Sequence, residues 1–257
     1  MKKIYNLIRK ITKFFGILVI RDRPSNSPDK QLSTLLSILN INLIFDVGAN
    51  EGQFAKGVRQ EKYKSKIVSF EPISLARRKL INLASKDKNW IIHEQCALGD
   101  SNGEIKINIS KNLVSSSILP INPLHTNAEK ESIYVDQEVV PICKIDDIEK
   151  NYINSNSRLF IKIDTQGYEK QILHGSKETL KKAKGVLCEL SLAPLYDGQV
   201  LWREIVDILD KQGFIIWALQ KGFTNPNTGQ TLQMDGIFIK KNEMNKILKK
   251  IDEKYYK

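Results

Sequence analysis

The sequence contains few of the residues from which metal centres and disulfide frameworks are built. Only three cysteines and three histidines occur among its 257 residues. Cys96, Cys143 and Cys188 lie within apolar runs, are odd in number and show no CxxC spacing, so they indicate neither a zinc site nor a set of disulfides. No stretch approaches the roughly 20 uninterrupted apolar residues of a membrane-spanning helix. These absences favour a cytoplasmic protein, and no metal centre is predicted.

The remaining composition is that of a soluble globular protein, with 41% hydrophobic and 27% charged residues. The formal net charge of +11 is compatible with nucleic acid, an anionic membrane surface, an acidic polymer or simple solubility, and it does not choose among them. We predict one large domain over residues 29–241, preceded by a helix and linker over residues 1–28 and followed by a lysine-rich tail over residues 242–257.

The N-terminal segment, residues 2–20, is predicted to form a basic amphipathic helix. Its apolar side chains recur at helical spacing and its basic side chains occupy the rest of the wheel: Ile4, Leu7, Ile8, Ile11, Phe14, Phe15 and Leu18 against Lys3, Arg9, Lys10 and Lys13. Charges interrupt the apolar run, which argues against a signal peptide. Two interpretations stay open: peripheral contact with the inner membrane surface, and packing on the protein's own domain or on a second subunit of a homodimer.

Residues 43–53 (LIFDVGANEGQ) are expected to form a ligand site. The apolar start has the pattern of a parallel strand covered on both faces. Gly48 and Gly52 follow, and residues without a Cβ atom let backbone amides approach a ligand and open a helix. Asp46 stands before the first glycine, where a carboxylate would repel a pyrophosphate and would suit a cationic ligand.

A second apolar strand ends in Glu71, nineteen residues after Gly52. An acid at that place accepts hydrogen bonds from the vicinal hydroxyls of a ribose. S-adenosylmethionine (SAM) combines a ribose with an ammonium and a sulfonium, which the carboxylates of Glu71 and Asp46 would suit. We therefore predict SAM as the cofactor.

Residues 90–100 (WIIHEQCALGD) are predicted to form a third strand whose end lies beside the adenine ring. Leu98 would pack on the base, and Asp100 would reach its amino group. Residues 104–148 then interrupt the alternation of strands and helices with two added strands, and this insertion is predicted to lie over the ligand mouth. Ser117 and His125 within it are candidates to face the substrate.

The fourth strand, residues 159–163, ends in Asp164, and a helix beginning with Tyr168 and Glu169 follows. Ligands of open parallel sheets bind beyond the carboxyl ends of the strands, so Asp46, Glu71 and Asp164 are expected to converge on one crevice. Asp164 is the first candidate for a catalytic base. Glu169 is the second, and its other possible roles are to cap its helix or to orient Asp164. A fifth strand over residues 185–192 and a closing hairpin complete the predicted sheet.

Taken together, these motifs resemble the FkbM family of SAM-dependent methyltransferases. The resemblance is carried by DVGANEGQF, SFEP, ALGD with the following Gly103, the serine loop of residues 115–117, IKIDTQGYE and QMDGIFIK, in that order, over about residues 29–240. It implies the class I, Rossmann-like α/β fold, with a seven-stranded, mostly parallel sheet and helices on both faces. It further implies that Asp46, Gly48, Asn50 and Gly52 line the methionine end of SAM. The family's usual acid is replaced by Gln166, which puts a charge-based role at that position in doubt.

The function predicted from these observations is SAM-dependent O-methylation of a hydroxyl, with a sugar in a glycan, glycolipid or natural-product precursor as acceptor. Most of the rate should come from positioning, with a base to take the hydroxyl proton. One alternative is an RNA or other nucleic-acid methyltransferase, which the net charge favours and the sequence DTQG after the fourth strand disfavours. The other is a SAM-binding scaffold at a membrane surface without turnover. Metal dependence through oxygen ligands at Asp164, the identity of the acceptor and the oligomeric state stay open.

Overall fold

The computed structural model describes residues 2–255, with side chains described for residues 5–248. A seven-stranded sheet forms its centre, in the order β3-β2-β1-β7-β8-β10-β9. The first five strands in this order run parallel, and β10 runs antiparallel to both of its neighbours. The strands are β1 (Leu43–Val47), β2 (Lys66–Phe70), β3 (Trp90–Ile92), β7 (Leu159–Ile163), β8 (Gly185–Ser191), β9 (Phe214–Lys221) and β10 (Gln233–Lys240). The predicted mostly parallel sheet and its closing hairpin are confirmed.

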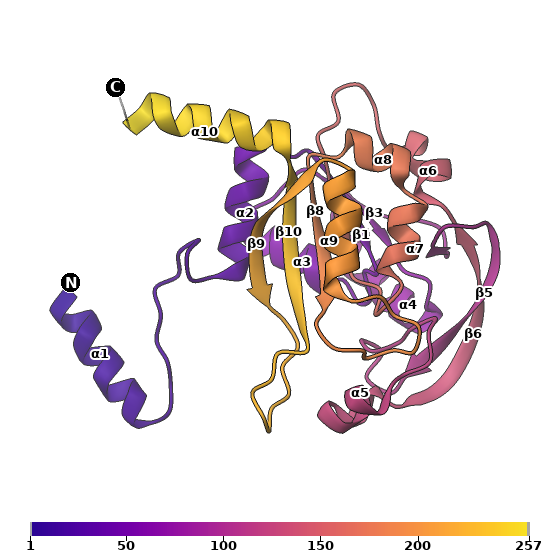
Figure 1. The fold of residues 1–257 in the computed structure, drawn as a ribbon, viewed down its shortest axis with the longest axis horizontal. Helices are drawn as coiled ribbons and strands as arrows, with labels where there is room; N and C mark the ends of the chain where they lie inside the picture. Colours follow the sequence, from indigo (N-terminus) through magenta and orange to yellow (C-terminus); the bar gives the residue numbers. More distant parts are fainter. Residues whose placement is uncertain (1, 256–257) are drawn as a thin grey trace.

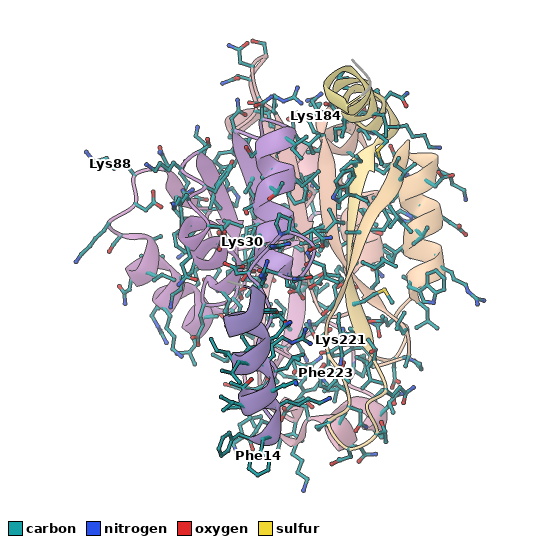
Figure 2. The ribbon with its side chains drawn as sticks, turned by 90° about the vertical axis from the view of Figure 1, so that its left-hand side faces the viewer. Phe14, Lys30, Lys88, Lys184, Lys221 and Phe223 are labelled. Carbon is teal, nitrogen blue, oxygen red and sulfur yellow. The ribbon has the colours of Figure 1, made fainter. Side chains whose placement is uncertain are left out.

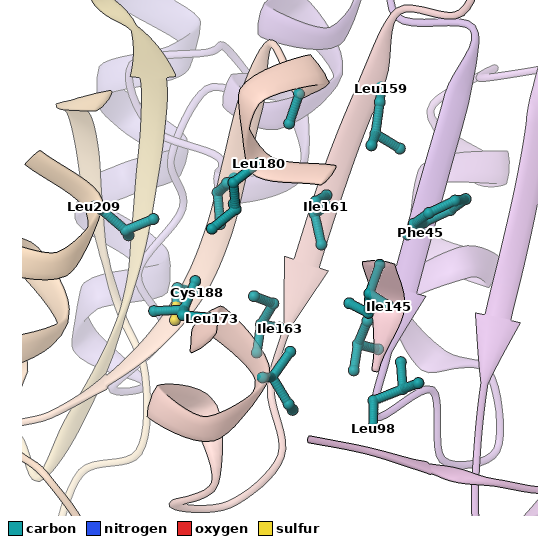
Figure 3. Packing of buried hydrophobic residues seen from close by; sticks show 14 of the residues in the cluster. Phe45, Leu98, Ile145, Leu159, Ile161, Ile163, Leu173, Leu180, Cys188 and Leu209 are labelled. Carbon is teal, nitrogen blue, oxygen red and sulfur yellow. The ribbon is translucent and has the colours of Figure 1, made fainter. Parts of the chain in front are cut away.

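Helices cover both faces of this sheet, as predicted (Figure 1). One layer contains α2 (Pro28–Ile38), α3 (Gln53–Gln60), α4 (Ser74–Ala84) and α10 (Lys241–Tyr255), and the other contains α6 (Ile145–Ile148), α7 (Glu169–His174), α8 (Lys177–Lys182) and α9 (Trp202–Lys211). Successive strand residues alternate between the layers, so Ile44 packs against the first and Phe45 against the second. Figure 3 shows the hydrophobic cluster between the sheet and the second helical layer, in which Ile161 and Ile163 of β7 pack near Leu173 and Leu180. Every residue of β1 and β7 is therefore buried.

A second sheet of three strands, in the order β4-β6-β5, forms the insertion. It contains β4 (Ala97–Leu98), β5 (Gly103–Ser110) and β6 (Tyr134–Cys143), with α5 (Pro123–Ala128) and a 3-10 turn (Lys130–Ser132) between β5 and β6; a second 3-10 turn (Glu149–Asn151) follows α6. The prediction of a single strand over residues 90–100 was wrong, because these residues form two strands, β3 and β4, in different sheets. Strand β3 pairs with β2 only as far as Ile92, and Ala97 and Leu98 pair with β6 instead. The chain turns between them, where Arg77 and Gln95 make hydrogen bonds to backbone carbonyls.

The predicted N-terminal helix is present as α1 (Lys2–Phe14), but it ends six residues before the predicted end at residue 20. It stands clear of the main body at the end of an extended linker (Figure 1). Its large apolar side chains are exposed, from 44% at Ile8 to 88% at Phe14, which lies at the tip of the helix in Figure 2. The side chains of Lys3 and Ile4 lie outside the described range. None of the helices within residues 2–255 has the length and apolar character needed to cross a bilayer. In this structure the protein's own domain does not cover the apolar face of α1.

Candidate active site

The carboxyl ends of β1, β2 and β7 open into a cavity of about 600 Å³, counted with its open mouth. The insertion, which was predicted to lie over the ligand mouth, contributes part of the cavity wall: Ile107, Leu113, Val114, Ser116, Ser117 and Ile118. The structure brings six of the predicted site residues to this cavity: Gly48, Asn50, Glu71, Leu98, Ser117 and Asp164. Tyr168 and Cys96 join them there, and the sequence interpretation assigned no role to either.

Gly48 makes the close approach of the β1 loop to the end of β7 possible. Its φ angle is 72°, in the left-handed region that favours glycine, and a Cβ atom there would overlap the backbone carbonyl of Asp164. Gly52, also at positive φ, precedes α3 and is buried against Leu80 and Trp90. Gly48 therefore shapes the cavity, whereas Gly52 does not line it and serves the packing of α3.

Glu71 is buried at the end of β2, and its carboxylate holds the backbone of two loops. One oxygen accepts from the Asn50 amide at 2.7 Å and the other from the Ile73 amide at 2.8 Å. Burial raises the pKa of Glu71 to about 7, although these hydrogen bonds and the charge of Lys162 oppose the shift. A carboxylate has about four acceptor positions, so two remain for a pair of vicinal hydroxyls. This buried acceptor at the cavity wall fits the ribose of SAM.

Asp46 lies beneath the cavity and does not line it. Its carboxylate is fully buried, with one oxygen accepting from the Ser69 hydroxyl at 2.9 Å and the other 3.5 Å from the ammonium of Lys162. Lys162 was missed in the sequence, where it is a single lysine inside the apolar strand IKI. The register of the sheet explains it, because Asp46 of β1 stands directly opposite Lys162 of β7. The carboxylate of Asp46, which the sequence analysis assigned to a cationic ligand, is therefore paired with Lys162 of the protein itself.

Asp164 lies at the cavity with its side chain 37% exposed, and two neighbours hold its carboxylate. The ammonium of Lys162 is 3.5 Å from one oxygen, and the side-chain amide of Gln166 donates to the other at 2.9 Å. The same amide nitrogen donates to Glu189 at 3.1 Å, and the side-chain oxygen of Gln166 accepts from the Tyr196 hydroxyl at 2.8 Å. Gln166 therefore supplies a donor between two carboxyl groups, which a deprotonated acid at this position would not do.

Glu169 and Ser117 hold the loop that carries Asp164. Glu169 is buried, and one of its oxygens accepts from the amides of Thr165 at 3.0 Å and Gly167 at 3.1 Å. The Ser117 hydroxyl donates to the backbone carbonyl of Gln166 at 2.6 Å. Glu169 does not line this cavity. The two amides that it binds precede α7, whose N-cap residue is Tyr168 and makes no side-chain capping hydrogen bond, so Glu169 holds the loop and does not cap the helix.

Besides Asp46, Gly52 and Glu169, two further predicted residues do not line the cavity. Asp100 is exposed at the turn after β4. His125 is buried in a separate cluster, where its ring lies edge-on to Tyr196 at 5.2 Å, and burial lowers the pKa of this histidine to about 4. A helix of six residues, α5, carries His125 inward, and nothing in its polar sequence context indicated this burial.

A second cavity, of about 1070 Å³ with its open mouth, adjoins the first across Gly48, Asn50, Val114 and Asp164, which line both. Its further walls come from α2, α3 and the ends of β7 to β10. They include Asp29, Gln53, Phe54, Lys162, Gln220 and Asp235. Burial raises the pKa of Asp235 to about 6, with the charge of Asp164 adding to the shift and Lys162 opposing it. Asp235 is the acid in the sequence motif QMDGIFIK, but the sequence analysis did not name it as a site residue.

No three His, Cys, Asp or Glu side chains in the described part of the chain gather in a way that would hold a metal ion.

Comparison with known proteins gives one family and one curated relative. A model described as "Methyltransferase FkbM domain" matches residues 46–216. The 2-O-methyltransferase NoeI of Sinorhizobium fredii is 30% identical over 177 residues, which is 65% of this chain and 70% of that protein. Among solved structures, the Aeropyrum pernix fibrillarin with bound SAM aligns at 9% identity and a TM-score of 0.44 over 82% of this chain and 74% of that one. An rRNA methylase from Streptococcus thermophilus aligns at 10% identity and a TM-score of 0.43, over 86% and 99%.

Proposed function

The chain belongs to the FkbM family of SAM-dependent methyltransferases, and on that premise we propose that it methylates a hydroxyl group of a carbohydrate. The observation that carries the proposal is the position of Asp164, a residue that lines both cavities and has a partly exposed side chain. A base at such a junction has the cofactor site on one side and room for an acceptor on the other. The name of the relative NoeI, a 2-O-methyltransferase, supports transfer to oxygen.

The first cavity supplies the groups that SAM would need. Glu71 offers its two free acceptor positions to the ribose, Leu98 offers an apolar surface to the adenine, and the glycine loop at Gly48 and Asn50 lies toward the methionine end. These assignments follow the predicted ones, except that Asp46 lies beneath the cavity and pairs with Lys162, and Gly52 contributes to the packing of α3. Asp100 has no part in the proposed site.

SAM, when bound, supplies a methyl group on a cationic sulfur, and transfer to a hydroxyl oxygen leaves a neutral thioether and releases the hydroxyl proton. Asp164 receives this proton in our proposal. Lys162 and Gln166 hold its two oxygens, which fixes the carboxylate in one orientation toward the acceptor. The rigid end of β7 and the hydrogen bonds of Glu169 to the Thr165 and Gly167 amides keep the loop in place, so that positioning contributes most of the rate.

We also propose that the enzyme works at an anionic membrane surface through α1. Residues 2–23 contain seven lysines and arginines against a single aspartate. The exposed Leu7, Ile11 and Phe14 give this basic helix an apolar face that the domain leaves open. A basic helix with such a face binds in the interfacial region of a bilayer, and each basic residue near anionic lipid contributes about 1 kcal/mol.

The proposed acceptor class is tested by incubating the protein with methyl-labelled SAM and a cell extract, then separating glycan, glycolipid and RNA fractions. We expect the label in the glycan or glycolipid fraction, and acid hydrolysis should release it as an O-methylated monosaccharide. The variant Asp164→Asn is the control for labelling by other proteins in the extract. Label that appears only in RNA would contradict the proposal.

A further inference from the structure

The second cavity contains a part that the first cavity does not share. That part is lined by residues of α2, α3 and the strands β7 to β10. Six of its residues carry polar or aromatic side chains: Asp29, Gln53, Phe54, Lys162, Gln220 and Asp235. We call this the outer pocket. Neither Glu71 nor Leu98 lines it, so it is separate from the surface proposed for adenosine.

We propose that the outer pocket is the acceptor site and that it binds a sugar ring that presents neighbouring hydroxyl groups. The inference rests on the proposed function and adds the place and the chemistry of acceptor recognition. The sequence predicted that His125 faces the substrate. His125 lies in a different cluster, beside Tyr196, and does not line the outer pocket.

The outer pocket is rich in hydrogen-bond acceptors, which is what a polyhydroxyl ligand requires. The Asp235 carboxylate is only partly buried and makes no hydrogen bond with any residue of the described chain. Gln220 uses its amide nitrogen on the Pro28 carbonyl at 3.1 Å and on Gln31 at 2.9 Å, which leaves its carbonyl oxygen as an acceptor. Neutral hydroxyl groups can donate to all of these oxygens.

Charge in the second cavity disfavours an anionic acceptor. Asp29, Asp164 and Asp235 bring three carboxylates to its wall, against one cation, Lys162. That lysine is already paired with Asp46 and Asp164, each at 3.5 Å. A phosphate of a nucleic acid would meet like charge here, whereas a neutral sugar would not.

Phe54 supplies the apolar surface that sugar recognition also uses. It lies on the first turn of α3, its side chain is partly buried, and the Lys162 ammonium is 5.9 Å from its ring centroid. One face of a pyranose presents C–H groups that pack on an aromatic ring, while the hydroxyls at its edge reach the surrounding carboxylates. The outer pocket therefore combines the two kinds of contact that fix a sugar in one orientation.

The test uses the full-length protein and two variants, Asp235→Asn and Phe54→Ala. Asp207→Asn is the matched control, because Asp207 is exposed on α9 in the opposite helical layer. Calorimetry measures SAM affinity for each protein. Initial rates with methyl-labelled SAM and a panel of methyl glycosides (glucoside, galactoside, mannoside and N-acetylglucosaminide) then give KM and kcat for the acceptor.

We expect the acceptor KM to rise about tenfold or more in both variants, with SAM affinity within about threefold of wild type and no change in the control. If both variants lose SAM affinity by tenfold, the pocket holds the methionine end of the cofactor and the inference is overturned. If wild type methylates a glycoside and both variants keep its KM, the inference fails while the proposed function stands. If wild type methylates no glycoside of the panel and only an RNA fraction, both fail.

Discussion

Lys162 and Asp46 form an enclosed ion pair beneath the glycine loop, with 3.5 Å between nitrogen and oxygen and side-chain exposures of 5% and 0%. The same ammonium donates to the Gly48 carbonyl at 2.7 Å and lies 3.5 Å from Asp164. Burial alone would lower the pKa of Lys162, but the charges of Asp164 and Asp46 outweigh it and raise the value. One side chain thus connects the loop proposed for the cofactor with the proposed base.

Removal of this lysine should be strongly destabilising. In Lys162→Met the Asp46 carboxylate would remain buried without its counter-ion, and breaking a buried pair in this way costs about 3–5 kcal/mol. Urea unfolding followed by circular dichroism measures the loss. The matched control is Lys181→Met, whose pair with Glu178 is exposed and should contribute less than about 1 kcal/mol. The double variant Asp46→Asn/Lys162→Met should recover part of the stability. A loss below about 1 kcal/mol in Lys162→Met would show that the pair is not needed.

The affinity for SAM should increase as the pH rises from about 6 to 8. Burial raises the pKa of Glu71 from 4.5 to about 7 in the folded protein. Its contribution to folding stability is therefore fully present below about pH 4.5 and is lost as the pH rises through 7. Ribose hydroxyls donate to the ionised carboxylate, so SAM binding should favour that form and release a proton. Calorimetry in buffers of different ionisation enthalpy measures this proton release.

The variant Glu71→Gln isolates that carboxylate. It should bind SAM more weakly than wild type at pH 8, by about tenfold or more, because each hydrogen bond to a charged group contributes roughly 1.5–3 kcal/mol. Its affinity should also be nearly independent of pH between 6 and 8. An equal pH slope in both proteins would assign the proton release to another group and remove the ribose role of Glu71.

Gly48→Ala should impair SAM binding more than its backbone strain alone predicts. The new Cβ atom would overlap the Asp164 carbonyl and push the loop away from β7. Gly198→Ala is the matched control, since Gly198 has a similar positive φ of 80° and open space around it. Both variants should lose about 1 kcal/mol of stability from strain. We expect a loss of SAM affinity of tenfold or more only in Gly48→Ala, and similar affinities in the two variants would refute the close-approach argument.

Removal of residues 1–24 should abolish sedimentation with anionic vesicles of phosphatidylglycerol and phosphatidylcholine. Turnover on a soluble acceptor should be retained, because α1 stands apart from both cavities (Figure 1). The full-length variant Ile11→Ser/Phe14→Ser keeps every charge and should bind vesicles weakly, which separates the apolar contribution from the electrostatic one. Full-length protein that ignores these vesicles at low salt would contradict the membrane role.

The parts of the fold that the sequence predicted correctly depend on local patterns. Continuous apolar runs identified β1 and β7. The rule that ligands bind at strand ends correctly placed Glu71 and Asp164 at one cavity, whereas Asp46, which was expected there with them, lies beneath it. The surroundings of Lys162 and Asp235 depend on pairing between strands that are distant in the sequence. Lys162 lies opposite Asp46, and Asp235 lies opposite Glu189. No local pattern contains that register.

The wrong predictions for residues 90–100 and for His125 have a similar cause. A run such as residues 90–100 gives no sign of where one strand stops pairing with β2 and the next begins to pair with β6. His125 sits in a polar stretch that is typical of an exposed loop, yet packing against Tyr196 and Phe223 buries it. Both outcomes are decided by tertiary contacts that the flanking residues do not encode.

The central claim, methyl transfer to a hydroxyl with Asp164 as base, is tested most directly by single-turnover kinetics of Asp164→Asn. Enzyme in excess over the acceptor found by the labelling experiment is mixed with saturating labelled SAM, and product is measured over time. Loss of a general base typically costs about a hundredfold to ten-thousandfold, so methyl transfer should slow by that factor while calorimetry finds SAM affinity within a few fold of wild type. A variant that transfers the methyl group at nearly the wild-type rate would contradict the account.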